Sequence, residues 1–218
     1  RYGSVLGKPI RDLEDFKKEF KILLEHKPDH LKIILTGLVD FKQYGESGEV
    51  AFKGPELQYM VDAAKDRGLP VMVHANGREG VERAAAAGVH TIEHGYLISE
   101  AQVYRMAEKG IIWIPTLAPL GNILRTLDRK FGRKERAVIS RVYTKQVENI
   151  RKAVEMGLKI ALGSDAGAYA VVHGQGLFNE LEHMQRIGLS RGELKKMCSE
   201  NGSKALRLNG FTDRQEAP

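Results

Sequence analysis

Four side chains that can bind a metal or move a proton stand within or just past strand-like apolar runs: Lys32, His74, His94 and Asp165. They are far apart in the sequence, but parallel α/β barrels place their chemistry at the carboxyl ends of the strands. The four groups would therefore meet at one mouth of such a barrel. Neutral imidazoles suit zinc and similar divalent ions, and a carboxylate adds a hard oxygen ligand. The leading hypothesis is a hydrolytic metal centre.

Each of these residues also has a simpler interpretation. Lys32 could extend its ammonium group out of an apolar strand, and a single histidine could be a hydrogen-bonded core residue. A buried lysine, however, has a lowered pKa, and its neutral amine can react with carbon dioxide to give a carbamate that bridges two metal ions. Two histidines that close successive strands, with Asp165 closing another, favour one shared site.

Other polar residues near these runs are expected to be structural. His90 begins its run, and His26 and His30 precede theirs, so all three belong to the end of a barrel that serves stability. Glu93 precedes His94 by one position, and successive side chains of a strand point to opposite faces. Glu93 is therefore expected to support or pack near the site and not to catalyse.

Helical and strand-like segments alternate along the chain. Apolar spacing, caps and terminal glycines predict helices at 12–26, 55–67, 80–87, 99–109 and 143–156, and a last one from Ser190 toward 206. Buried strands are predicted at 31–36, 70–74, 90–93, 111–115 and 158–162. Near-continuously apolar strands between helices indicate a parallel sheet covered on both faces, either a barrel or an open doubly wound sheet.

Three longer segments without a clear period follow predicted strands, at 37–54, 116–140 and 166–176. In a barrel these positions lie at the mouth, and long loops in a compact domain commonly bind ligands or act as lids. Substrate selection is therefore expected to reside in these segments.

The composition fits one globular unit. The chain has 218 residues, of which 42% are hydrophobic and 28% charged, enough apolar content to bury one sizeable core. Its single cysteine excludes an intramolecular disulfide and fits a reducing compartment. No apolar run is long enough to cross a bilayer, and no signal-like segment opens the sequence. We therefore expect a cytoplasmic protein that does not act at a membrane.

The positive net charge does not by itself indicate a nucleic-acid partner. The formal charge is +6, but 34 basic residues are interleaved with 28 acidic ones. The one dense basic stretch, 125–141, includes Arg129 and contains a single aromatic residue, Phe131, with no recognition motif. A solvated helical face is the preferred interpretation, and no nucleic-acid partner is expected.

The same positions resemble motifs of the amidohydrolase superfamily, most closely its branch of imidazolonepropionase-related and prolidase-like peptidases. The matching segments are DHLKI at 29–33, VHANG at 73–77, GVHTIEHG at 88–95 and GSDAG at 163–167. The resemblance extends from about Leu13 to Leu208. It implies an α/β fold, a partial (β/α)8 TIM-type barrel with strands four to eight and their helices.

The resemblance also implies roles. Lys32 would be the carboxylated bridging lysine of strand four, His74 and His94 the metal ligands of strands five and six, and Asp165 both a ligand and the catalytic proton acceptor. One or two divalent ions, zinc above all, would activate a water that attacks an amide, peptide or cyclic amide C–N bond. The residues expected to hold a small-molecule or peptide-like substrate are Tyr96 and His173.

The sequence departs from the superfamily in two features. Members begin the barrel with a His-any-His pair on strand one and usually build a β-sandwich from both termini, and neither is present here. Residues 1–218 are therefore expected to be the C-terminal part of the barrel, inactive alone, which associates with a copy of itself or with the missing N-terminal part. Two other hypotheses stay open: a mononuclear deaminase-like hydrolase with unmodified Lys32, and a non-catalytic partial barrel that acts as a scaffold.

Overall fold

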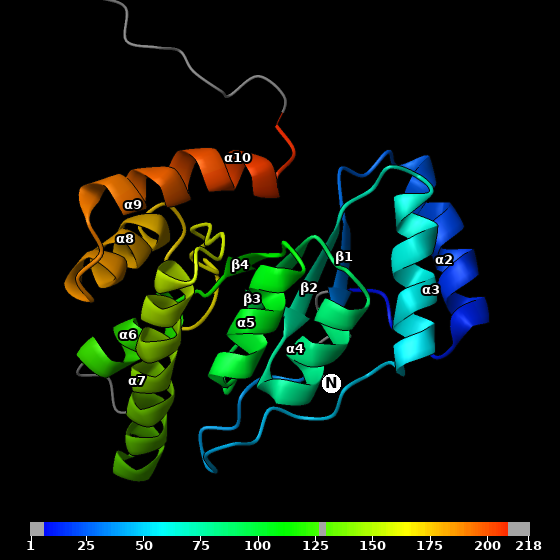
Figure 1. Cartoon of the computed structure of the whole chain (residues 1–218). Helices are drawn as coiled ribbons and strands as arrows, with labels where there is room; N and C mark the ends of the chain where they lie inside the picture. The colour runs from blue at the N-terminus through cyan, green and yellow to red at the C-terminus, as the bar shows by residue number, and fades with distance from the viewer. Residues whose placement is uncertain (1–6, 127–129, 209–218) are drawn as a thin grey trace, which may run out of the picture.

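A parallel sheet of four strands forms the centre of the molecule. The structure is a computed structural model that describes residues 7–126 and 130–208. The strands lie in the order in which they occur in the sequence (Figure 1): β1 (Leu31–Ile34), β2 (Val71–Ala75), β3 (Thr91–His94) and β4 (Ile112–Ile114). The sheet is not closed, so the expected α/β class and partial barrel are confirmed.

The segment 158–162, expected to form a fifth strand, pairs with β4 at a single bridge between Ile160 and Trp113. Trp113 N donates to Lys159 O at 2.9 Å, and Ala161 N donates to Trp113 O at 2.9 Å. The next donor of this ladder would come from position 115, where proline has no N–H. The expectation of a full strand is therefore wrong, although the segment does lie parallel to β4.

The helices are α2 (Leu13–Glu25), α3 (Gly54–Lys65), α4 (Gly77–Ala86), α5 (Glu100–Glu108), α6 (Ala118–Arg125), α7 (Arg133–Glu155), α8 (Gly176–Arg186), α9 (Arg191–Lys196), the π-helical η1 (Met197–Asn201) and α10 (Gly202–Ala205). Helix α2 precedes the first strand, and α3, α4 and α5 each lie between two successive strands. Asp12 and Ser190 cap α2 and α9 through their side chains, and the cap at Ser190 was predicted from the sequence. Among the described residues, no helix is both long and apolar enough to span a bilayer.

The helices cover one face of the sheet. Helices α3, α4, α5 and α7 contact one another in this order, and α4 and α5 lie in front of the strands in Figure 1. Beneath them lie the apolar residues of the strands, each 7% exposed or less: Leu31, Ile33, Val71, Val73, Ile92 and Trp113. Successive residues of a strand alternate between faces, so the residues between these belong to the other face.

The second face, which we call the open face, carries the polar residues of the strands. The pairing register aligns Lys32 with Met72 and Thr91, and Ile34 with His74 and Glu93. A closed barrel turns this face inward. Lys32 is exposed and Met72 is half-buried, but Ile112 is buried against Ala161 and Ala205. The expectation of a sheet covered on both faces therefore holds for the helix-covered face and, on the open face, only toward β4.

The loops differ from the expectation in one place. Segments 37–53 and 166–175 contain no helix or strand, but α6 and the first turns of α7 occupy most of 116–140, and α8 was not expected. The guanidinium of Arg136 donates to the carbonyls of Ile123 and Leu124, both at 2.8 Å, and so caps the end of α6. Of the basic stretch 125–141, Arg133 and Lys134 are exposed on α7, as expected, and Arg129 lies outside the described residues.

We predict that the chain associates through the outer edge of β1 and the open face, because unpaired strand edges bind other strands. Light scattering at micromolar concentration should give a mass well above the 24.3 kDa of one chain, with more than ~1,000 Å² buried. Ile34→Lys, on the open face, should weaken this association. Ile22→Lys, on an exposed position of α2, should not. A monodisperse monomer with a cooperative thermal transition would contradict the prediction.

Candidate active site

Two histidines from neighbouring strands meet at the carboxyl end of the sheet. The ring centroids of His74 and His94 are 4.6 Å apart, and the rings are inclined by 66°. The register pairs His94 with Ala75, whose side chain lies on the helix-covered face. His94, however, has a φ of +67°. This left-handed conformation turns the chain out of the strand and lets the imidazole of His94 reach that of His74.

Buried side chains hold His94 in this position. Its carbonyl accepts hydrogen bonds from Trp113 Nε1 at 3.0 Å and from Gln146 Nε2 at 2.6 Å. Its Nδ1 lies 2.7 Å from Thr116 Oγ1. The tautomer in which Nδ1–H donates to this hydroxyl leaves the lone pair on Nε2, the nitrogen that can then bind a metal.

A second set of contacts surrounds His74. Its Nε2 lies 3.2 Å from the carbonyl of Gly37, which also accepts from Asn76 Nδ2 at 3.3 Å. Asn76 Oδ1 accepts from Tyr96 N at 3.1 Å, which fixes the orientation of the amide. The same Nε2 also lies 3.2 Å from Asn76 Nδ2. One neutral tautomer of His74 donates Nε2–H to Gly37, and the other accepts at Nε2 from Asn76.

Both histidines are neutral near physiological pH. Burial lowers the pKa of His94 well below its ordinary value, and the charges of His74 and Lys32 lower it further. Burial also lowers the pKa of His74; the hydrogen bond to Gly37 opposes this effect, and the charge of Lys32 adds to it. Neutral imidazole is the form that ligates zinc.

Lys32 forms an ion pair with Glu93 on the open face. Glu93 also accepts a hydrogen bond from the hydroxyl of Thr91. The alternation with His94 was expected to turn Glu93 away from the site, but the register places it on the same face as Lys32 and His74. The side chain of Lys32 is 46% exposed. The expectation of a buried lysine is therefore wrong. The strand register instead places Glu93 within reach of an exposed ammonium group.

Asp165 lies just beyond the 158–162 segment, in a left-handed conformation with φ of +53°. Although the residue is exposed, the protein around its carboxyl desolvates it enough to raise its pKa. The charge of Lys32 lowers this pKa and that of Glu93 raises it. Asp165 is thus in electrostatic contact with the open face.

The structure places the other predicted residues as follows. Tyr96 is 7% exposed and donates its hydroxyl proton to Thr116 O at 2.5 Å. His173 is exposed in the 166–175 loop, next to Gly167. His90 lies 3.0 Å and 3.2 Å from the carbonyls of Lys204 and Ala205, so its structural role is confirmed.

The predicted ligands are only partly assembled. The structure joins His74 with His94, and Lys32 with Glu93. In residues 7–126 and 130–208, no three His, Cys, Asp or Glu side chains converge on a point that could hold a metal ion. The donor chemistry suits a divalent ion, but the geometry of the structure supplies the two imidazoles only.

Sequence reasoning missed several buried polar residues around this site. Glu180 has no exposed surface, and Gln146 is 1% exposed. Both lie on helix faces that are otherwise buried, with Met184 four residues after Glu180 and Ile150 four residues after Gln146. A polar residue at a position where the helical period predicts an apolar one would have indicated these buried groups.

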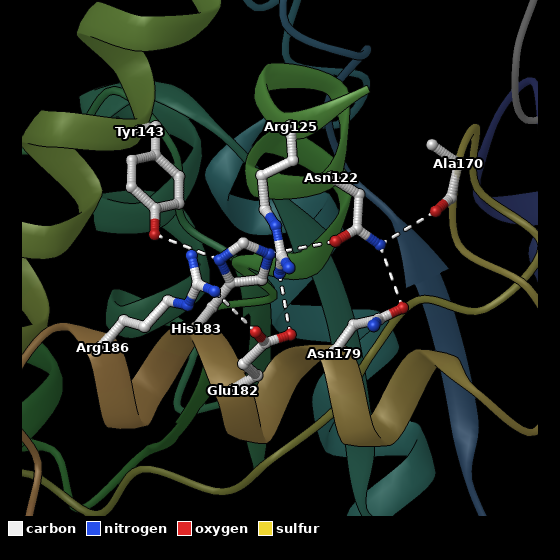
Figure 2. A network of polar contacts seen from close by, with 8 residues as sticks. All are labelled: Asn122, Arg125, Tyr143, Ala170, Asn179, Glu182, His183 and Arg186. Atoms are coloured by element: carbon white, nitrogen blue, oxygen red, sulfur yellow. Dashed lines mark hydrogen bonds and ion pairs between the residues drawn. The ribbon is translucent and has the colours of Figure 1, made fainter. Parts of the chain in front are cut away.

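A polar network joins α6, α7 and α8 to the loop after Asp165 (Figure 2). His183 Nε2 lies 3.0 Å from Asn122 Oδ1, and its Nδ1 lies 3.3 Å from the hydroxyl of Tyr143. Asn122 Nδ2 donates to Ala170 O at 2.9 Å and to Asn179 Oδ1 at 3.2 Å. The amide of Asn122 therefore ties the loop that follows Asp165 to the helices behind it.

Arg125 and Arg186 both pair with Glu182 on the surface beside this network, each at 2.8 Å (Figure 2). The ring of His183 lies directly against Gly121, where a Cβ would approach within 2.2 Å of it. Only a glycine allows this contact, which lets α6 and α8 pack closely enough for the network to form.

Comparisons with known proteins agree with one another. A sequence profile described as the Amidohydrolase family matches residues 3–210. An uncharacterized protein of Mycobacterium tuberculosis is 27% identical over 162 residues, 74% of this chain and 43% of that protein. Ochratoxinase from Aspergillus niger is 22% identical over 153 residues, 70% of this chain and 32% of that enzyme.

A crystal structure of a Xaa-Pro dipeptidase with bound methionine is 30% identical and superimposes with a TM-score of 0.74, covering 91% of this chain and 48% of that one. The chain therefore spans less than half the length of each of these relatives.

We predict that His183 makes the protein less stable in acid. Burial, with the positive charge of Arg125, lowers the pKa of His183 to about 4, whereas an unfolded histidine titrates near ~6.5. Between these values the unfolded chain binds a proton that the folded chain does not. The free energy of unfolding should therefore fall as pH decreases through this window, by up to ~1.4 kcal/mol per pH unit.

Denaturant titrations between about pH 7 and about pH 5 test this prediction. His183→Gln should be less stable than wild type at neutral pH and should lose less stability on acidification. Asn179→Ala, which removes an uncharged member of the same network, should keep the wild-type dependence on pH. An unchanged slope in His183→Gln would show that another group causes the acid sensitivity.

Proposed function

The chain belongs to the amidohydrolase family, and from this premise we propose that it forms strands four to eight of a metal-dependent hydrolase that cleaves an amide, peptide or cyclic amide C–N bond. The observation that carries the proposal is the meeting of two neutral, buried imidazoles, His74 and His94, at the carboxyl end of a parallel sheet. Barrel enzymes place their chemistry at this end.

We propose the tautomers in which His74 donates Nε2–H to Gly37 and His94 donates Nδ1–H to Thr116. Nδ1 of His74 and Nε2 of His94 then keep the lone pairs that can bind a metal. We propose Lys32 and Asp165 as the further ligands, and zinc as the ion. When bound, a divalent ion acts as a Lewis acid and lowers the pKa of a water molecule.

The proposed work of Asp165 is to accept the proton of the attacking water and to pass it to the leaving nitrogen. Its raised pKa, caused first by desolvation, makes it a better proton acceptor than an ordinary surface carboxylate. Because His173 is exposed, we propose that it contacts substrate. The hydroxyl of Tyr96 is already bonded to Thr116, so a direct substrate contact by Tyr96 is not supported.

The substrate class rests on likeness. The Xaa-Pro dipeptidase is 30% identical to this chain, and this likeness favours a dipeptide or a similar small amide over a polymer. A nucleic-acid or membrane partner is not part of the proposal, and the compartment proposed for the protein is the cytoplasm.

One observation favours a second candidate, a mononuclear deaminase-like hydrolase with unmodified Lys32. Formation of a carbamate needs the neutral amine of lysine. The ion pair with Glu93 stabilises the charged ammonium form instead. A site with a single ion and a charged Lys32 agrees with this pairing, whereas a carbamate would place a negative group against the carboxylate of Glu93.

We predict that the chain binds zinc through its histidines. Isothermal calorimetry should show that His74→Ala and His94→Ala weaken zinc binding by more than ~100-fold, since even outer partners of ligands contribute 10–100-fold. His26→Ala, at the exposed end of α2, is the control and should bind as wild type does. Wild-type affinity in His94→Ala would reject the site, and retained binding in Lys32→Ala would favour the mononuclear candidate.

We predict a catalytic role for Asp165 in the complete enzyme. Asp165→Asn should preserve the fold but remove the proton acceptor, and it should lower kcat on dipeptide substrates by about 10²–10⁴-fold. Asp66→Asn, at the exposed C-cap of α3, should leave kcat unchanged. Near-normal turnover of Asp165→Asn would contradict the assignment.

A further inference from the structure

A carboxylate on α8 is fully buried beside the start of α6. Glu180 accepts hydrogen bonds from Leu117 N at 2.9 Å and from Ala118 N at 2.6 Å, one on each oxygen. When Glu180 is ionised, these hydrogen bonds are stronger than those between neutral groups. The N-terminal end of α6 also favours a negative charge at this position. The contact therefore fixes the two amide groups firmly.

The first of these amides belongs to the peptide group that joins Thr116 to Leu117. Its N–H donates to Glu180, and its carbonyl, on Thr116, accepts the hydroxyl proton of Tyr96 at 2.5 Å. One peptide plane is thus held at both ends, by a side chain from α8 and by one from the segment after β3. Because this plane sets ψ of Thr116, Glu180 and Tyr96 together fix the backbone there.

Thr116 needs such support. Its φ of +50° is uncommon for a β-branched residue. Strain of this kind costs about 1–3 kcal/mol and persists only where the surroundings over-determine the conformation. The Oγ1 of the same residue lies 2.7 Å from His94 Nδ1. If the peptide were released, Thr116 could relax and its hydroxyl would leave His94.

We propose that Glu180 is a positioning residue for His94: it holds the Thr116–Leu117 peptide in the orientation in which Thr116 Oγ1 accepts the proton of His94 Nδ1–H. His94 Nε2 then keeps its lone pair. The inference rests on the proposed function in so far as His94 is a metal ligand, but the hydrogen-bond arrangement itself does not require a metal.

The electrostatics agree with this placement. Burial raises the pKa of Glu180 to about 7 although its two backbone hydrogen bonds lower it, and the charge of Asp165 raises it further. The charge of Glu180 adds to burial in raising the pKa of Tyr96. Glu180 therefore lies within the electrostatic field of the candidate proton acceptor and of the tyrosine that holds the same peptide.

A purely structural role, fastening α6 to α8, makes a different prediction. Other contacts already connect these helices: Asn122 with His183 and Asn179, and Arg125 with Glu182. If Glu180 served only to join the helices, its loss would lower stability and leave the imidazole of His94 unchanged. The state of the His94 ring is therefore the measurement that separates the two roles.

The test is nuclear magnetic resonance of the ¹⁵N-labelled chain, in which long-range ¹H–¹⁵N spectra report the tautomer of each imidazole and His94→Gln assigns the His94 signals. Wild type should show one neutral tautomer with the proton on Nδ1. Glu180→Gln keeps the side-chain volume but leaves one amide N–H without an acceptor, and it should give a mixture of tautomers. Glu180→Ala should do the same. Tyr96→Phe releases the other end of the peptide and also removes the 3.0 Å contact of the tyrosine hydroxyl with Thr116 Oγ1, so it should give a mixture as well.

Glu182→Gln is the matched control, because it removes a carboxylate from the exposed side of α8, two residues away. Its His94 spectrum should be that of wild type. Thermal unfolding by circular dichroism identifies the variants that fold, and Glu180→Gln decides the question if Glu180→Ala does not. An unchanged His94 spectrum in a folded Glu180 variant overturns the proposal.

A zinc titration of the same proteins separates this inference from the proposed function. Glu180→Ala should bind zinc about 10–100-fold more weakly than wild type, the range for groups that orient a ligand, while Glu182→Gln should bind normally. Equal zinc affinity in Glu180→Ala and wild type would overturn the inference. If wild type binds no zinc, the proposed function fails, and the spectra of the metal-free proteins still decide whether Glu180 positions His94.

Discussion

The carbonyl of His94 accepts two hydrogen bonds from side chains of different elements, Trp113 on β4 and Gln146 on α7. These bonds fix the point at which β3 ends, where His94 and Gly95 both adopt positive φ. A Cβ at Gly95 would lie 2.7 Å from Trp113 Nε1, so only glycine lets the chain pass over the indole here. The meeting of His94 with His74 depends on this turn, as does the docking of α7 against the strand end.

The two faces of the sheet determine where charged side chains can lie. The helix-covered face is apolar, so every polar side chain of the central strands must emerge on the open face or at the strand ends. Lys32 and Glu93 form an ion pair there. The charge of Lys32 lowers the pKa of Asp165, and that of Glu93 raises it. The histidines, by contrast, lose their charge because they are buried. The same short strands thus produce a neutral pair of imidazoles beside a pair of opposite charges.

The sequence predicts best what depends on local pattern. β2 and β3 end at Ala75 and His94, each within one residue of the predicted end, and Ser190 caps α9 as predicted. These features follow from apolar runs and from residues a few positions away. The sequence does not predict contacts between residues that are far apart in the chain. Lys32 meets Glu93 because of the register between three strands, which no run of residues encodes.

The buried helix residues were missed for a related reason. Glu180 and His183 break the apolar period of α8, and their partners, at Leu117 and Asn122, come from another part of the chain. The predicted fifth strand does not form beyond one bridge, because Pro115 lacks the N–H that would have extended the ladder. In each case the decisive partner is a neighbour in space and not in sequence.

A side chain occupies part of the outer edge of the 158–162 segment. The carbonyl of Ile160 that points away from β4 accepts a hydrogen bond from Asn201 Nδ2 at 2.8 Å. The side chain of Asn201, on η1, thus occupies a hydrogen-bonding position that another strand would use. Any strand that joins this edge, including strand one of a complete barrel, would compete with Asn201 for the carbonyl of Ile160. Closure of the barrel and the position of η1 are therefore linked through this one hydrogen bond.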